Sequence, residues 1–90
     1  MAVLMRRWGA LIRELRKEKG MSQEELAARS STLGKPPLQV KPAYIARLEM
    51  GYIDKPSPDI IRALAFGLGM PLTELERRRG AGARPADFSG

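Results

Sequence analysis

Two helices meet within a few residues after Gly20, and this junction constrains the fold more than any other feature of the sequence. The first helix is predicted from apolar residues that recur at helical spacing before the glycine: Trp8, Leu11, Ile12 and Leu15. Gly20 can take the left-handed conformation that closes a helix. Ser22 then begins a capping box with Glu25, in which the serine caps the second helix and the glutamate reaches back. The second helix starts at Gln23 and fades near Ser30, so almost no connector separates the two.

Three further helices are predicted from similar start and stop signals. Pro42 suits the first position of a helix, because its missing N–H would have no partner there, and Gly51 can close the same helix. The fourth helix begins with the capping Ser57 and the first-turn Pro58, and the fifth spans about residues 72–78. Apolar side chains on the inward faces are expected to form one core: Trp8, Leu15, Leu26, Ile45, Leu48, Ile61, Leu64 and Leu68. No segment has the signals of a strand, so the predicted fold class is all-α, a bundle of five helices.

The helices are expected to form one domain over residues 6–79, flanked by segments without a core pattern. Residues 1–5 are interpreted as a flexible N-terminal arm, and residues 80–90 as a disordered C-terminal tail. Inside the domain, residues 31–41 contain glycine and prolines, and the residue before each proline is driven to extended geometry. The second and third helices are therefore predicted to be joined by an extended loop.

The residue types present exclude several classes of site. The sequence has no cysteine and no histidine, which removes disulfides, thiolate chemistry, Cys/His zinc sites and catalysis through an imidazole. Gly34 and Lys35 lack the Walker spacing around them, so no enzyme activity, metal or cofactor is expected. The longest mostly apolar run, residues 63–72, is too short to cross a bilayer, and the N-terminus lacks the order of a signal peptide. We therefore expect a cytoplasmic protein.

The charge balance indicates a polyanionic partner. Sixteen lysines and arginines stand against ten aspartates and glutamates, which gives a formal net charge of +6 in 90 residues. Such a balance in a small domain is typical of proteins that bind nucleic acid, although a solvated arginine-rich surface gives the same count. Charge alone leaves both interpretations open.

Residues 12–27 resemble the Cro and phage-repressor family of helix-turn-helix proteins, also called the xenobiotic-response-element (XRE) family. The resemblance resumes at residues 44–51 and continues through 56–58 and 64–72, so it covers roughly residues 6–76 in the right order. It implies a five-helix domain that binds double-stranded DNA sequence-specifically as a transcriptional regulator, and we expect a repressor. The sequence departs from the family where the turn between the second and third helices is longer than the tight family turn. The core still closes if this insertion loops outward, because lengthening a surface loop costs little free energy.

The resemblance implies that the helix over residues 42–50 reads the major groove. The base-facing positions are then Pro42, Ala43, Tyr44 and Arg47. Arg47 is the strongest of these, because its guanidinium can donate two parallel hydrogen bonds to guanine, whereas a solvated or phosphate-bound arginine is the alternative. The expected phosphate contacts are Gln23, Lys35, Lys41 and Lys55. By the same resemblance, Arg16 and Glu49 form an internal ion pair between the first and third helices.

A second interpretation is a helix-turn-helix-fold protein-interaction module, or an antitoxin-like protein whose main partner is another protein. Leu38, Val40 and Tyr44 would then form an exposed apolar patch. For the DNA-binding interpretation we expect a homodimer on an inverted repeat, because one short helix reads too few base pairs to be selective. Leu72 and Leu75 on the fifth helix, or the adjacent tail, are one candidate for the dimer surface. No small-molecule effector and no membrane partner is indicated.

Overall fold

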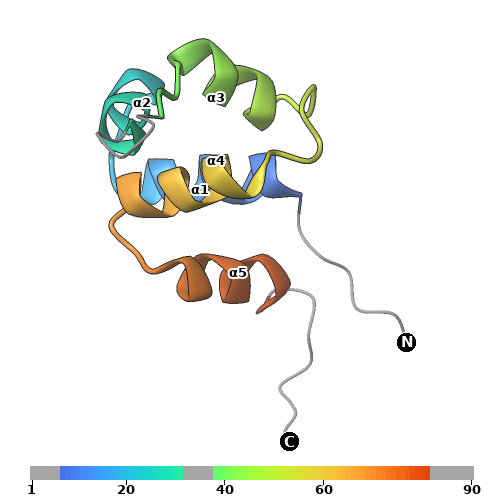
Figure 1. The fold of residues 1–90 in the computed structure, drawn as a ribbon. Helices are drawn as coiled ribbons and strands as arrows, with labels where there is room; N and C mark the ends of the chain where they lie inside the picture. The colour runs from blue at the N-terminus through green and yellow to red at the C-terminus, as the bar shows by residue number, and fades with distance from the viewer. Residues whose placement is uncertain (1–6, 32–37, 82–90) are drawn as a thin grey trace, which may run out of the picture.

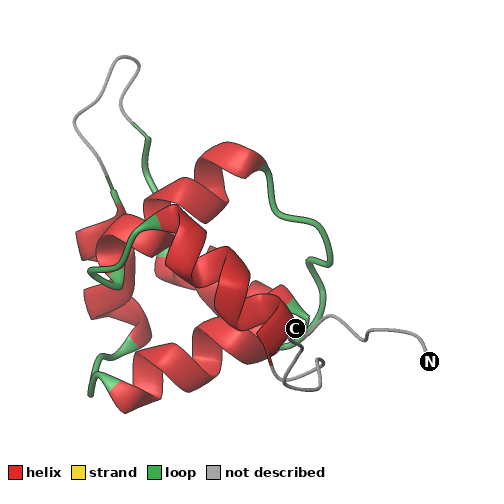
Figure 2. Ribbon diagram, turned by 90° about the horizontal axis from the view of Figure 1, so that it is seen from below, coloured by secondary structure: helices red, strands yellow, loops and turns green. Residues whose placement is uncertain are grey.

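Five α-helices make up the described part of the chain, residues 7–31 and 38–81 of the computed structural model (Figure 1). They are α1 (Trp8–Glu18), α2 (Gln23–Ser30), α3 (Pro42–Glu49), α4 (Pro58–Gly67) and α5 (Leu72–Ala81). In Figure 1, α2 and α3 form the upper layer, α1 and α4 the middle layer, and α5 the lower layer. Loops join the helices, as the view from below shows (Figure 2). The all-α, five-helix prediction is confirmed.

The helices begin and end where the local chemistry requires. Ser22 Oγ accepts a hydrogen bond from the Glu25 N–H at 3.0 Å, and Ser57 Oγ accepts one from the Ile60 N–H at 3.3 Å. The Glu25 carboxylate accepts a hydrogen bond from Arg29 Nη2, one turn further along α2, at 3.3 Å. Of the predicted capping box, the structure therefore shows the half made by the serine. Gly51 has φ +88°, the left-handed conformation that follows the end of α3.

The predicted core forms as expected. All eight apolar side chains assigned to it from the sequence are buried, and further buried residues join them: Leu11, Ile12, Met21, Ala27, Val40, Ala63, Ala65 and Leu75. Packing of α1 against α3 and of α2 against α4 brings these side chains together. The core therefore draws on all five helices, and Ile45 and Leu48 fix the inner face of α3 against it.

Two glycines allow helices to approach each other closely. A Cβ built on Gly9 of α1 would lie 1.9 Å from the carbonyl oxygen of Leu48 in α3. One built on Gly67 of α4 would lie 2.3 Å from Ser30 Oγ in α2. Any larger residue at either position would push two helices apart, so both glycines are required by packing.

The end of α5 differs from the prediction. The helix continues through Gly80 and Ala81, which were expected to belong to the tail. Polar contacts near its end explain the difference: the Arg79 guanidinium lies 4.5 Å from the centre of the Trp8 ring, and Arg78 lies 3.9 Å from Glu18 of α1. Contacts of this kind are made by charged side chains, so the apolar periodicity used to predict the helices does not reveal them. Residues 1–5 and 82–90 lie outside the described residues.

None of the helices in the described ranges has the length and hydrophobicity needed to cross a bilayer.

Candidate nucleic-acid interface

Helix α3 buries one face and exposes the other. Ile45 and Leu48 are fully buried, whereas Pro42, Ala43 and Arg47 are exposed. The helix lies at the edge of the bundle with α2 beside it (Figure 1). Three of the four residues assigned to base contact therefore lie on a single accessible surface at the edge of the molecule.

Tyr44 differs from its three neighbours on α3. Its side chain is only half-buried, but it packs against the hydrophobic core, and this burial raises the pKa of its phenol. The ring therefore contributes to packing at the start of α3. Contact with a base has to be made from its accessible edge.

Arg16 and Glu49 form a two-pronged ion pair between α1 and α3. Arg16 Nε donates to Glu49 Oε2 at 2.8 Å and Arg16 Nη2 donates to Oε1 at 3.0 Å. The side chains are only 11% and 5% exposed. The remaining Nη1 donates to the carbonyl oxygen of Met21 at 2.8 Å, so the guanidinium also holds the α1–α2 turn. The hydrogen bond to Glu49, opposed by desolvation, raises the pKa of Arg16 above its ordinary value.

Gln23 joins the same network from the first position of α2. Its Nε2 donates to Glu49 Oε1 at 3.1 Å. Gln23, which the family resemblance assigns to a phosphate, is thus hydrogen-bonded to Glu49, the last residue of α3. Because the amide keeps a second N–H beyond this bond, a phosphate contact is still chemically possible. The network fixes the start of α2 relative to the end of α3.

Ser31 fixes the opposite ends of the same two helices. Its hydroxyl donates to the carbonyl oxygen of Ala27 at 3.0 Å and accepts from the Val40 N–H at 3.0 Å. Val40 precedes Lys41, the residue that caps α3, and its side chain is 3% exposed. The extended loop therefore leaves α2 and returns to α3 at one point, so α2 and α3 stay in contact despite the added residues.

Two of the basic residues assigned to phosphates are described, one at the start of α3 and one in the loop between α3 and α4. Lys41 is exposed at the N-cap of α3, and Lys55 is exposed in the loop that follows the helix. Lys35 lies outside the described residues. Two exposed residues were missed by the sequence reasoning: Met50 at the C-cap of α3 and Tyr52, which is 75% exposed. The sequence signal for the exposure of Tyr52 is its position directly after the helix-closing Gly51, outside the apolar periodicity of α3.

One expected protein-contact surface does not form, and the candidate dimer surface on α5 loses one of its two leucines. Val40 is buried in the core, and Leu38 and Tyr44 are half-buried against it, so the exposed apolar patch expected for a protein partner does not form. Leu75 is fully buried within its own bundle and Leu72 packs against the same core, so Leu75 has no surface to offer a second copy. Val40 and Leu75 both pack inside the domain's own core, which leaves neither side chain accessible to a partner.

The described residues contain no group of three or more acidic side chains placed to hold a metal ion.

Comparison with known proteins agrees with this geometry. The family model described as HTH_3, Helix-turn-helix, matches residues 12–75. Two crystal structures of the clp gene regulator ClgR from Corynebacterium glutamicum are similar to the chain, both with a TM-score of 0.62. One is 26% identical and the match covers 88% of this chain and 90% of that chain, while the other is 28% identical and covers 82% and 68%. No curated protein matches the sequence. The chain belongs to the HTH_3 family of Cro- and XRE-like helix-turn-helix DNA-binding domains.

Proposed function

We propose that the protein is a sequence-specific double-stranded DNA-binding transcriptional regulator that reads the major groove with α3. One observation carries the proposal: α3 exposes Pro42, Ala43 and Arg47 while its opposite face is fixed in the core. A recognition helix needs both properties, because base contacts require an accessible side chain on a helix that does not shift. The likeness to ClgR, described as a gene regulator, supports the same class.

Arg47 is the base-specific donor in this proposal. Its guanidinium donates two hydrogen bonds to O6 and N7 of a guanine, and this contact favours guanine by about 1–3 kcal/mol over another base. Pro42 and Ala43 carry no side-chain donor, so they contribute shape and contact to a thymine methyl group. Tyr44 contacts the DNA with the edge of a ring that is otherwise packed against the core.

Phosphate contacts orient α3 on the duplex. Lys41 at the N-cap of α3 and Lys55 in the loop between α3 and α4 supply positive charge, and Lys35 adds a third contact from the loop between α2 and α3. Gln23 binds a phosphate through the amide N–H that Glu49 does not use, beside the backbone N–H groups at the start of α2. The net charge of +6 favours the same polyanion.

The protein acts as a homodimer on an inverted repeat and works as a repressor in the cytoplasm. A two-fold pair of α3 helices would contact half-sites about one helical turn, 10–10.5 bp, apart. Dimerisation supplies the selectivity that eight residues of one helix lack. Repression needs only that the bound protein covers the promoter, which a DNA-binding domain can do without an effector.

Selection of bound sequences from a random duplex pool tests this function. The wild-type chain should enrich an inverted repeat, and Arg47→Ala should keep the repeat but lose the preference for one base in each half-site. Arg62→Ala is the matched control, because Arg62 is an exposed arginine on α4 whose partner is Asp59 of the same helix. A pool that stays random with the wild-type chain contradicts sequence-specific binding.

The alternative of a protein-interaction module predicts a different dependence on salt. A DNA-binding protein loses affinity steeply as salt is added, because each phosphate contact releases a counterion. Binding to a duplex that ignores salt, or that shows no site preference, favours the alternative.

A further inference from the structure

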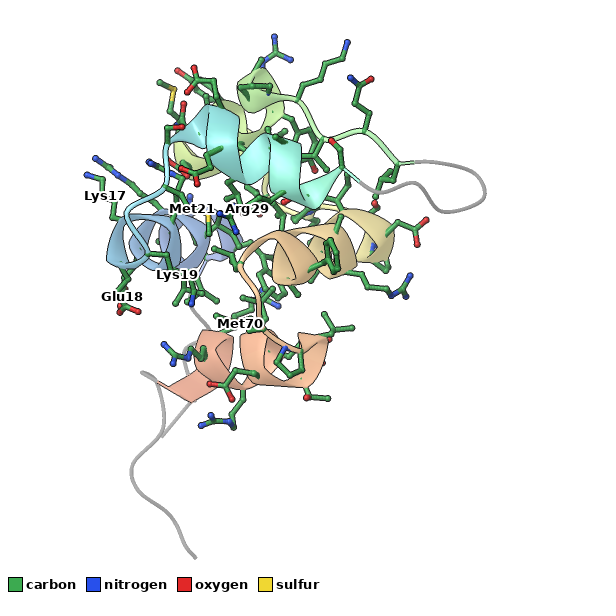
Figure 3. The ribbon with its side chains drawn as sticks, turned by 90° about the vertical axis from the view of Figure 1, so that its left-hand side faces the viewer. Lys17, Glu18, Lys19, Met21, Arg29 and Met70 are labelled. Carbon is green, nitrogen blue, oxygen red and sulfur yellow. The ribbon has the colours of Figure 1, made fainter. Side chains whose placement is uncertain are left out.

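A hollow of about 420 Å³ lies between the α1–α2 turn and the C-terminal end of α4. It is lined by Lys19, Met21, Arg29, Phe66, Gly67, Leu68 and Gly69. We refer to it as the α2–α4 hollow. Figure 3, which looks at the left-hand side of Figure 1, shows Met21 and Arg29 between the α1–α2 turn and α4. The proposed DNA surface is the exposed face of α3, at the top of Figure 1, so the two surfaces lie on different sides of the bundle.

Phe66 exposes an apolar ring at the rim of this hollow. Its side chain is 69% exposed, although it lies on α4 between the buried Ala65 and Gly67. The floor below is also apolar, since Leu68 is buried and Met21 is 9% exposed. A single exposed aromatic residue is ordinary, but this ring lies at a hollow that has further apolar residues in its lining, and together they offer a small apolar contact site for another molecule.

Backbone geometry keeps the hollow open. A Cβ built on Gly69 would meet nothing within 4 Å, and Gly69 has φ +73°, which disfavours a side chain there. At Gly67 the close approach of Ser30 forbids any side chain. Gly67 therefore holds α4 close to α2 at one side of the hollow, and only Gly69 faces open space there.

The charges at the rim are positive. Lys19 and Arg29 line the hollow, and the described residues that line it include no acidic side chain. Arg29 contacts Glu25 at 3.3 Å, but both side chains are about half exposed, and such surface pairs contribute only about 0–1 kcal/mol. Glu18, close by in the sequence, lies 3.9 Å from Arg78 of α5. The rim can therefore accept carboxylates from a partner.

We propose that the α2–α4 hollow docks an acidic segment of a partner protein. One large apolar side chain of the segment would fill the space between Phe66 and Met21, and its flanking carboxylates would contact Lys19 and Arg29. Charge complementarity selects an acidic partner, and the apolar floor selects a peptide over nucleic acid, because a phosphate backbone would leave Phe66 uncovered. This site is separate from the DNA surface and does not depend on the proposed reading of bases.

The test uses the full 90-residue chain and a fluorescein-labelled twelve-residue peptide of aspartate and glutamate around one leucine and one phenylalanine. Fluorescence anisotropy should show binding, and Phe66→Ala should weaken it by about tenfold or more through lost apolar burial. Replacing the leucine and phenylalanine of the peptide by serine should weaken binding equally. Arg29→Ala should weaken binding of the peptide and flatten its salt dependence. Arg62→Ala, on α4 like Phe66, should leave peptide binding unchanged. The melting temperature of Phe66→Ala should match the wild type, because the ring lies in solvent.

Three results overturn the proposal. The first is no binding of the peptide by the wild-type chain. The second is equal binding by Phe66→Ala or of the serine peptide, which would mean that charge alone attracts the probe. The third is displacement of the peptide by a short DNA duplex bound at the same residues, which would assign Lys19 and Arg29 to the nucleic-acid surface. Failure of DNA binding by itself leaves this proposal intact, since the peptide is measured without DNA.

Discussion

The hydroxyl of Ser31 accepts a hydrogen bond from the backbone N–H of Val40 at 3.0 Å, and this contact closes the base of the loop between α2 and α3. The loop is where the chain departs from the tight turn that the family resemblance implies. Because the contact brings the loop ends together, the added residues do not separate the two helices. The reading surface of α3 thus depends on a serine outside the helix.

Ser31→Ala tests this closure. The change leaves the Val40 N–H without its partner beside a buried side chain, so it should lower the free energy of unfolding by about 1–3 kcal/mol. Thr73→Ala, which removes a hydroxyl from an exposed position on α5, should stay within about 0.5 kcal/mol of the wild type. Urea unfolding measures both. Equal stability of Ser31→Ala and the wild type would show that the loop ends are held by something else.

Arg16→Ala should destabilise the fold much more. It leaves the Glu49 carboxylate, 5% exposed, without its main partner, and breaking such a buried pair costs about 3–5 kcal/mol. The double variant Arg16→Met with Glu49→Leu should recover part of the loss, because no unpaired charge remains. An Arg16→Ala protein that keeps its melting temperature contradicts this role.

Gly9→Ala should force α1 and α3 apart. The added methyl group would lie 1.9 Å from the Leu48 carbonyl oxygen, and overpacking of this kind costs about 1–3 kcal/mol or more. The adjacent exposed residue is the control: Ala10→Gly should cost only about 0.5–1 kcal/mol, through backbone entropy in a helix. Thermal unfolding compares the two. If Gly9→Ala proves the milder change, the helices are not in direct backbone contact.

The stability of α5 should depend on acid pH through Glu74. Hydrogen bonds from Arg78 and then Arg77 lower the pKa of Glu74 from its ordinary value of 4.5. Because the folded-state pKa is the lower one, the contribution is complete above pH 4.5 and is lost as the pH falls through the folded value. The melting temperature of Glu74→Gln should therefore lie below that of the wild type at pH 7, and the difference should shrink near pH 3. Glu76→Gln removes the same charge from the same helix and corrects for net charge. A difference that does not change with pH would contradict the pairing.

Salt dependence separates the phosphate contacts from the other lysines. Lys41→Ala should weaken binding to every duplex and reduce the slope of log K against log salt by about 0.9, because one fewer counterion is released. Lys19→Ala, at the α2–α4 hollow, should leave this slope unchanged. If the two variants behave alike, Lys41 has no special position on the DNA.

Local signals account for most of the fold. The caps at Ser22 and Ser57, the first-turn prolines and the periodic apolar residues determine where the helices lie and which faces are buried, since each signal acts within a few residues. Val40 could not be placed in this way, because its burial depends on Ser31 nine positions earlier. The last turn of α5 was missed for a similar reason, since Arg79 contacts Trp8 from the other end of the domain.

For the candidate site, the sequence predicts which residues of α3 are exposed but not the contacts that α3 makes with other helices. Exposure of Pro42, Ala43 and Arg47 follows from the helical spacing of Ile45 and Leu48. The contact of Gln23 with Glu49 was not foreseen, because no local pattern indicates that the start of α2 meets the end of α3. Phe66 likewise stood within an apolar segment, and only the packed bundle shows that its ring faces solvent.

The most direct test of the recognition role of α3 is a double-mutant cycle between Arg47 and one base. A guanine in the selected half-site is replaced, and binding of both duplexes is measured for the wild type and for Arg47→Ala. The predicted result is that the replacement weakens wild-type binding by about 1–3 kcal/mol and leaves Arg47→Ala binding unchanged. If every guanine replacement weakens both proteins equally, Arg47 does not read a base and the account of α3 is wrong.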